Sequence, residues 1–151
     1  MPAVIDRRLL FRRRVDNLAF QGYLIKVGNY EVPQKYINAG SYNAFLSAQD
    51  LDSYRDGNGV LHRNALEHTP AKVEFETASM LTGKEFAELM KSISDNYISS
   101  TERKASITAY LPEQDDYIIQ DMYMPDIIPT INSILNGEVR YNSIRIACIG
   151  Y

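Results

Sequence analysis

The stretch Leu81-Thr82-Gly83-Lys84-Glu85-Phe86 (residues 81–86) predicts the start of a single amphipathic helix in a strand-rich chain. The predicted fold class depends on this helix. Thr82 can accept a hydrogen bond from the Glu85 amide, and the Glu85 carboxylate can accept one from the Thr82 amide. This capping box satisfies donors that the first turn of a helix otherwise leaves unpaired. The apolar residues that follow at helical spacing are Phe86, Leu89, Met90 and Ile93. We therefore expect a helix over residues 83–95 with one apolar face.

Segments on both sides of this helix alternate between apolar and polar residues, as strands with one buried face do. The clearest example is residues 72–78, in which Lys72, Glu74 and Glu76 share one face. Together these segments predict a mostly antiparallel sheet. The expected strands cover residues 22–27, 41–48, 72–78, 104–111, 117–124 and 139–149.

Turn signals complete the predicted architecture. Asn136-Gly137 predicts a type I′ hairpin turn before the last strand, and residues 126–134 form either a half-turn or an edge strand. The sequence predicts an α+β fold, a mostly antiparallel β-sandwich or rolled β-barrel with one flanking amphipathic helix and an N-terminal arm. We expect a basic arm over residues 1–21 and a single β-rich domain over residues 22–151.

Composition is that of a globular protein. The chain has 151 residues, of which 45% are apolar and 23% are charged, so one domain of this size can bury a sufficient core. Cys148 is the only cysteine, and its apolar neighbours predict a buried core position. The sequence contains neither an apolar run near the ~20 residues of a membrane span nor a signal peptide. We expect synthesis in the cytoplasm and no membrane association.

Charge is distributed unevenly along the chain. Residues 1–14 carry five arginines against Asp6, whereas the remaining 137 residues carry 11 basic and 18 acidic side chains. The arm either docks on the acidic body of a neighbouring copy, or forms a solvated tail, or binds nucleic acid through its arginines. Docking is favoured because apolar residues, which phosphate contacts do not need, interrupt the arginines. The predicted interface residues of the arm are Arg7, Arg8, Leu9, Leu10, Phe11, Arg12, Arg13 and Arg14.

Motifs for catalysis or metal binding are missing from the sequence. His62 and His68 lack the spacing of a zinc site, and the aspartates around Asp52 lack the glutamate that ends a calcium-binding loop. Neither a phosphate-binding glycine loop nor a nucleophile motif occurs. The candidate carboxylates for an enzyme are Asp115, Asp116 and Asp121, which have no spaced base or nucleophile. We predict no enzyme activity, cofactor or metal.

A family resemblance is carried by three segments: residues 72–75, the capped helix, and residues 49–63. The last of these reads Gln49-Asp50-Leu51-Asp52-Ser53-Tyr54-Arg55-Asp56-Gly57-Asn58-Gly59-Val60-Leu61-His62-Arg63. The stretch resembles an uncharacterised family of small tail proteins from phages and prophages of Gram-positive bacteria. The shared pattern is an aspartate, then Arg55, Gly59 and Arg63, then a Lys-x-Glu strand and the capped helix. It covers residues 23–96 well and the later strands loosely. The basic arm departs from the family, whose members start close to the first strand.

The resemblance implies a tail-tube-like or distal-tail-like protein that assembles with copies of itself, as a hexameric ring, and with other tail proteins. It implies a location in the virion tail or in a phage-tail-like particle, after synthesis in the bacterial cytoplasm. An acidic lumen would let DNA pass without specific binding. The loop residues expected to meet an adjacent subunit are Asp50, Asp52, Arg55, Gly57, Gly59 and Arg63, with both glycines at positive φ. The alternative is a β-barrel module that binds nucleic acid or a small ligand and uses the Arg-rich arm.

Overall fold

The computed structural model describes residues 20–151. Most of the described strands form one seven-stranded sheet with the order β2-β1-β7-β8-β11-β6-β3, and every pairing in it is antiparallel. The predicted mostly antiparallel α+β fold is confirmed. The strands of this sheet are β1 (Ile25–Val27), β2 (Tyr30–Glu31), β3 (Asn43–Leu46), β6 (Ala71–Glu76), β7 (Lys104–Leu111), β8 (Asp116–Tyr123) and β11 (Arg145–Gly150).

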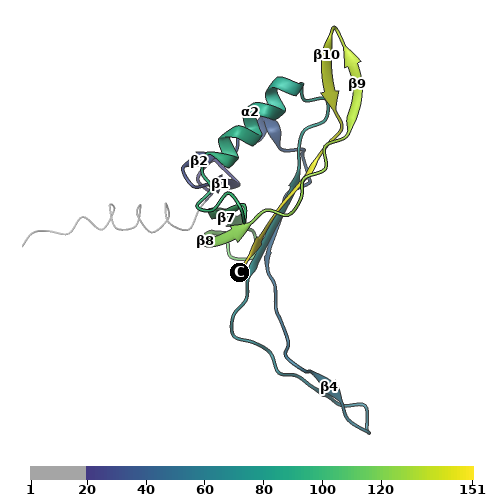
Figure 1. Cartoon of the computed structure of the whole chain (residues 1–151). Helices are drawn as coiled ribbons and strands as arrows, with labels where there is room; N and C mark the ends of the chain where they lie inside the picture. The colour runs from purple at the N-terminus through teal and green to yellow at the C-terminus, as the bar shows by residue number, and fades with distance from the viewer. Residues whose placement is uncertain (1–19) are drawn as a thin grey trace, which may run out of the picture.

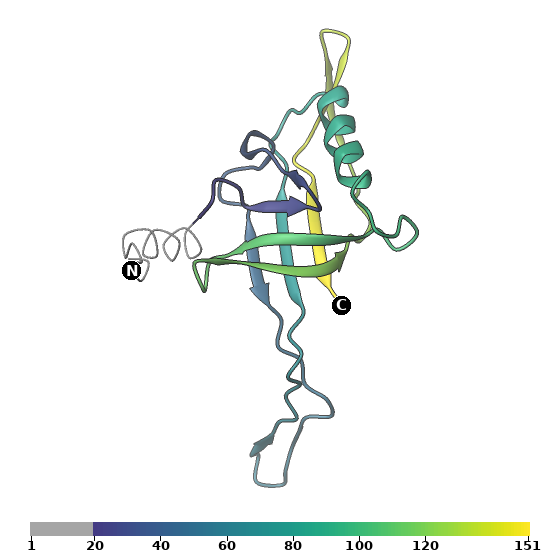
Figure 2. The same cartoon turned by 90° about the vertical axis from the view of Figure 1, so that its left-hand side faces the viewer.

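This sheet is folded into two layers. In Figure 2, β1, β7 and β8 cross in front of β3, β6 and β11 at a steep angle. The two halves are joined by the pairing of β8 with β11, which covers only Ile149↔Tyr123 and Gly150↔Met122. A short junction of this kind lets the sheet bend so that its two halves face each other. The described strands do not close into a barrel, because β2 and β3 remain as edges; the predicted rolled barrel is not confirmed.

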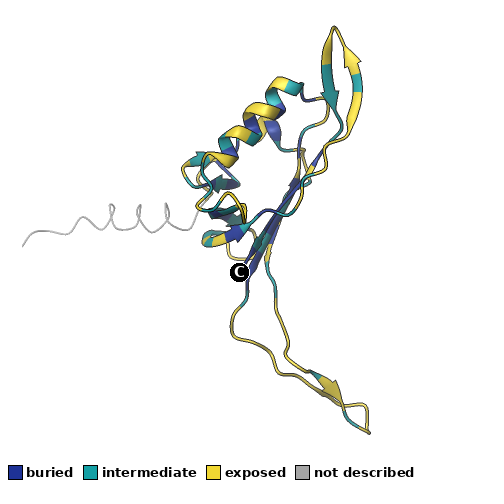
Figure 3. Ribbon diagram, in the orientation of Figure 1, coloured by how far each residue is buried: buried dark blue, intermediate teal, exposed yellow. Residues whose placement is uncertain are grey.

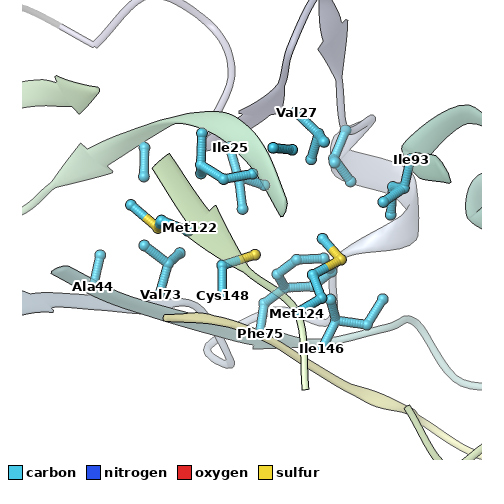
Figure 4. Packing of buried hydrophobic residues seen from close by; sticks show 14 of the residues in the cluster. Ile25, Val27, Ala44, Val73, Phe75, Ile93, Met122, Met124, Ile146 and Cys148 are labelled. Atoms are coloured by element: carbon cyan, nitrogen blue, oxygen red, sulfur yellow. The ribbon is translucent and has the colours of Figure 1, made fainter. Parts of the chain in front are cut away.

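The hydrophobic core lies between the two layers and under the helix. Side chains from β1, from β6 and β11, and from the helix point toward one another in Figure 4. Ile25, Val27, Ile93 and Cys148 are fully buried. Burial raises the pKa of the Cys148 thiol to about 12, because the apolar surroundings disfavour the thiolate. The predicted core position of this cysteine is confirmed.

The helix α2 (Gly83–Ser94) covers one end of this core. Its start follows the prediction: the Glu85 amide donates to Thr82 Oγ1 at 3.1 Å, and the Thr82 amide donates to Glu85 Oε1 at 3.3 Å. Both residues flanking the cap, Leu81 and Phe86, are buried. The chain therefore enters the helix at a fixed angle.

The prediction of one long final strand over residues 139–149 is wrong, because this segment is divided between two sheets. Its first part is β10 (Glu138–Tyr141), which pairs with β9 (Ile131–Leu135) outside the seven-stranded sheet. The chain then changes partner at Ile144, whose amide donates to Thr77 Oγ1 at 2.9 Å. The polar Asn142 stands at the break and bonds to Thr130 and Asn132 instead of continuing the ladder.

The segment at residues 126–134, predicted as a half-turn or an edge strand, contains β9, which is one arm of a separate hairpin. A second separate hairpin consists of β4 (Tyr54–Arg55) and β5 (Leu61–His62). The described part also contains a short 3₁₀ helix, η1 (Gln34–Tyr36), whose Tyr36 is buried. The predicted boundary between arm and domain at residue 21 stays a prediction, because residues 1–19 lie outside the described part.

Candidate assembly surfaces

Two hairpins project from opposite ends of the folded sheet (Figures 1 and 2). The lower one, residues 47–70, connects β3 to β6 and carries β4 and β5 near its tip. The upper one, residues 130–142, carries β9 and β10 and stands beside the start of α2. Figure 3 shows both as predominantly exposed, in contrast to the buried centre of the sheet. The structure therefore concentrates exposed chain at the two ends of an elongated molecule.

The lower hairpin is held together along its length by main-chain and side-chain bonds. The Leu51 amide donates to the Asn64 carbonyl, and the Leu66 amide donates to the Gln49 carbonyl, both at 2.8 Å. Arg63 bonds Asp50 in a bidentate pair, with Nε and Nη2 donating at 3.0 and 2.7 Å. The pair lowers the pKa of the Asp50 carboxyl, chiefly through the hydrogen bonds from Arg63. This fork geometry fixes the two arms of the hairpin in register.

The tip is closed by a second set of polar contacts. Asp56 Oδ1 accepts from the amides of Asn58 and Val60 at 2.9 and 3.1 Å, and its Oδ2 lies 2.9 Å from His62 Nε2. The hydrogen bond from His62 is the largest cause that lowers the pKa of Asp56. Arg55 Nη1 donates to the Gly59 carbonyl at 2.9 Å. The polar residues that carry the family resemblance thus bond to one another inside the hairpin.

Only one of the two glycines predicted at positive φ has it. Gly59 has φ +80°, as expected, but the prediction for Gly57 is wrong. The Gly59 amide donates to the Asp56 carbonyl at 2.9 Å, which closes a four-residue turn. In a type I turn followed by a left-handed residue, the two central positions keep negative φ. The special conformation therefore falls on Gly59, immediately after the turn.

Large apolar side chains remain exposed between these polar contacts. Their exposed fractions range from 42% for Leu66 to 59% for Tyr54. Sequence reasoning missed this surface because the aspartates and glycines dominate the stretch. The sequence carried no local signal for it, because an apolar residue on a projecting hairpin cannot be told from one that faces a core. We call these five residues the lower patch: Leu51, Tyr54, Val60, Leu61 and Leu66.

The upper hairpin shows a second exposed apolar group. Ile134 is 74% exposed and Ile128, just before β9, is 78% exposed. The register pairs Ile134 with Val139 across the hairpin, so these two side chains share one face. Sequence reasoning missed this surface too, because it placed residues 139–149 in a single strand. We call three residues of β9 the upper patch: Ile131, Ile134 and Leu135.

Contacts with α2 hold the base of the upper hairpin. The Tyr141 ring lies 5.0 Å from the Phe86 ring, and Arg140 Nη1 donates to the Met80 carbonyl at 3.1 Å. Thr82, the helix cap, forms a bridge with Arg140. At the tip, Asn136 and Gly137 have φ +52° and +75°, which confirms the predicted type I′ turn.

The remaining predicted residues do not converge on a site. Asp115 accepts from the Tyr110 hydroxyl at 2.5 Å, and Asp116 accepts from the Tyr117 amide at 2.7 Å. Asp121 pairs with Ser106 in the ladder, five residues further along β8 than Asp116, and therefore points to the opposite face. His68 contacts the Tyr151 carbonyl and lies apart from the His62–Asp56 contact. Within residues 20–151, acidic, histidine and cysteine side chains nowhere gather in a group able to hold a metal.

The predicted arm interface, Arg7 to Arg14, lies outside the described residues. The first described residue is Phe20. Its ring makes an edge contact with the Tyr110 ring, with 5.7 Å between the ring centroids. The next residue, Gln21, donates its amide to the Tyr117 hydroxyl at 2.8 Å. The arm therefore joins the body at the turn end of β7 and β8.

Comparison with known families gives one match over most of the chain. A family of unknown function, DUF6711, matches residues 18–151. The chain belongs to this family. The match includes both projecting hairpins of this DUF6711 protein and begins after all five arginines of the arm. The hairpins are therefore part of the family's domain, whereas the basic arm precedes it.

Among solved structures, the DUF6711 protein is similar to a chain described as "Tail of empty GTA particle computed with helical refinement, C6 symmetry". The identity is 12%, the TM-score is 0.48, and the similarity covers 87% of this chain and 92% of that chain. No match was found among curated proteins. Among the described residues, none of the helices is long and apolar enough to span a membrane.

Proposed function

We propose that this DUF6711 protein is a structural subunit of a phage tail or tail-derived particle, of the kind found in Gram-positive bacteria. It forms a hexameric ring in a tail tube or in a baseplate or distal-tail position, and acts by assembly without performing a reaction. The tail assignment follows the sequence resemblance of residues 23–96. The assembly mechanism follows the geometry of the two hairpins.

One observation carries the assembly mechanism: each end of the molecule presents an exposed two-stranded hairpin with large apolar side chains. A two-stranded hairpin alone is marginally stable in water, and exposed apolar groups of this kind mark interaction sites. The lower patch and the upper patch lie at opposite ends. A contact between different ends of identical copies is heterologous, and repeats along an axis. In the proposal, the lower hairpin of one copy contacts the upper hairpin of the next.

The charge of the body suits a passage for DNA. Residues 20–151 hold 11 basic and 17 acidic side chains, so the described part carries a net negative charge. Such a surface repels phosphate and lets DNA pass without specific binding.

The first test substitutes one residue in each patch. Leu61→Asp and Ile134→Asp each place a charge in an apolar contact and are expected to abolish long assemblies while leaving the monomer folded, because both side chains are exposed. Sedimentation and negative-stain images measure assembly. Ile119→Asp is the matched control, because Ile119 is 71% exposed but lies on β8, outside both hairpins.

A mixture of the two variants distinguishes a head-to-tail contact from a symmetric one. The Leu61→Asp protein keeps an intact upper patch, and the Ile134→Asp protein keeps an intact lower patch. The mixture is therefore expected to form axial pairs that neither variant forms alone, yet no longer stacks. Wild-type protein that stays monomeric at high concentration, with no ring even beside other tail proteins, would overturn the proposed function.

A further inference from the structure

A groove runs between the C-terminal end of α2 and the segment that follows β8. It consists of two adjoining hollows of about 450 Å³ each, which share Arg103 and Asp126. The apolar side chains that line them come from α2, from the turn after it, and from the segment after β8. We call this feature the α2 groove, with the apolar lining Met90, Tyr97, Met124, Pro125, Ile127 and Ile128.

The lining of the α2 groove is incompletely covered. Ile128 is 78% exposed, although it stands beside the half-buried Met90 and Ile127. The Tyr97 hydroxyl donates only to the Met124 sulfur, at 3.6 Å, and a thioether is a weak acceptor. Burial raises the pKa of this tyrosine. The groove therefore offers apolar surface and a polar hydroxyl whose present partner is weak.

The rim of the groove carries acidic groups. Asp126 pairs with Arg103 at 2.9 Å, yet its side chain remains 84% exposed. Glu102 lines the second hollow and is exposed. A carboxylate as exposed to solvent as these two still has lone pairs that can accept hydrogen bonds from a further arginine.

The N-terminal arm has the matching composition. Leu9, Leu10 and Phe11 form an apolar triplet, with two arginines directly before it and three directly after it. An apolar floor with a carboxylate rim complements this order of residues, because the triplet can enter the hollow while the arginines remain at the edge.

The root of the arm and the α2 groove lie at opposite ends of the ribbon formed by β7 and β8 (Figure 2). Phe20 contacts Tyr110 near the turn of this ribbon, whereas Arg103 and Met124 flank its open end. The register from Lys104↔Tyr123 to Tyr110↔Tyr117 spans six residues, which is roughly 20 Å of strand. A donor and an acceptor at different places on one molecule make a heterologous contact, which closes a ring of identical copies when the rotation between neighbours closes.

We propose that Leu9, Leu10 and Phe11 of one copy occupy the α2 groove of the neighbouring copy, with the flanking arginines on the Asp126 and Glu102 carboxylates. This inference rests on the proposed function and adds the lateral contact within a ring to the axial contact of the hairpins. The occupant is a second copy of this chain.

Cysteine cross-linking between two differently sized copies tests the contact directly. One copy carries Phe11→Cys, and the other, enlarged by a tag, carries Ile128→Cys. Cys148 is fully buried and does not compete under mild oxidation. We expect a mixed disulfide dimer in several-fold larger yield than with the control partner Ile119→Cys, because Ile119 is 71% exposed against 78% for Ile128 but lies outside the groove.

A single chain that carries both Phe11→Cys and Ile128→Cys shows which copy supplies the arm. We expect a ladder of covalent multimers on a non-reducing gel. A fast-migrating monomer with an internal disulfide would overturn the proposal, because the arm would then occupy its own groove. So would equal yields with the groove and control partners while wild-type protein still forms rings; that result would leave the proposed function intact.

Substitution of the triplet supplies a measurement without cysteines. Phe11→Asp is expected to raise the concentration for half-assembly about tenfold, as loss of a buried aromatic anchor does. Ile128→Asp should have a similar effect, whereas Ile119→Asp should have none. If Phe11→Asp and Ile128→Asp both assemble like the wild type, the groove is not the lateral contact.

Discussion

The two projecting hairpins are stabilised in different ways, although both expose apolar side chains. The lower hairpin is closed by its own polar residues, with Asp50 paired to Arg63 and Asp56 bonded around the tip. The upper hairpin is tied to the body, because Tyr141 packs on Phe86 and Arg140 bridges to the helix cap. The lower hairpin can therefore keep its local shape when the body changes. The position of the upper hairpin, by contrast, depends on the body.

This difference matters for assembly. A heterologous contact between the two ends joins a locally stabilised hairpin to one whose position depends on α2. Stability of the helix would then affect one side of the contact and not the other. Destabilising the helix, removing its cap and lowering the pH should affect the two hairpins unequally, in decreasing order of size.

Destabilising the helix should reveal the difference in stability between the two hairpins most clearly. Leu89 on α2 is fully buried, so Leu89→Ala is expected to lower the free energy of unfolding by about 2–5 kcal/mol. Amide hydrogen exchange should accelerate in β9 and β10 more than in β4 and β5 under native conditions. Glu88→Ala, an exposed change on the same helix, is the control, with an expected effect within about 0.5 kcal/mol. Equal acceleration in both hairpins would contradict the comparison.

Removing the helix cap should destabilise the protein and the upper hairpin as Leu89→Ala does, but to a smaller extent. Thr82→Ala removes the oxygen that accepts from the Glu85 amide, which costs roughly 0.5–2 kcal/mol by chemical denaturation. The main chain at Thr82 also forms a bridge with Arg140, so a looser helix start should lower exchange protection at the base of the upper hairpin. Thr101→Ala, an exposed threonine outside the helix, should change neither quantity. A stable upper hairpin in Thr82→Ala would show that the helix start does not hold it.

Lowering the pH should weaken the polar contacts of the lower hairpin and produce the smallest effect of the three. Arg63 lowers the pKa of Asp50 below its ordinary value of 3.8, and His62 does the same for Asp56. A lowered carboxyl pKa stabilises the folded hairpin above the ordinary pKa, and the contribution is lost as the pH falls through the folded value. NMR spectra should therefore show the Leu51 and Leu66 amides losing protection below about pH 4.

Arg63→Gln is the matched variant for this titration, because it removes the Arg63 pair and leaves the Asp56 contacts in place. Its Leu51 and Leu66 amides should be less protected at neutral pH and should respond less to acid. An acid transition that is unchanged in Arg63→Gln would assign the pH dependence to groups other than the Asp50 carboxyl.

Local patterns in the sequence predicted the elements whose bonds lie close along the chain. The capping box at Thr82 and the turn at Asn136-Gly137 are confirmed, and the helix predicted over residues 83–95 is found at Gly83–Ser94. The strand pattern at residues 104–111 matches β7 residue for residue. Each of these depends on contacts within a few positions or on alternation along one strand, both of which are legible in one dimension.

The change of strand partner and the exposure of apolar side chains could not be predicted from local patterns in the sequence. The stretch from Val139 to Ile149 looks like one strand, but its first part pairs with β9 and its second with β6 and β8. Likewise, Leu61 and Ile134 are apolar residues without any local mark of exposure. Their exposed state follows from hairpins that extend beyond the body, which is a property of the arrangement in space.

Local hydrogen bonding and periodic burial require particular residues at particular spacings, so the capped helix, the alternating strands, the buried Cys148 and the polar residues that close the lower hairpin can be predicted from the amino-acid order. The two crossing layers of the sheet, the division of the last strand and the apolar patches at opposite ends arise only when the chain packs in three dimensions. Those features depend on which distant segments pair, and pairing is selected by the packing of the whole core rather than by any single stretch of residues.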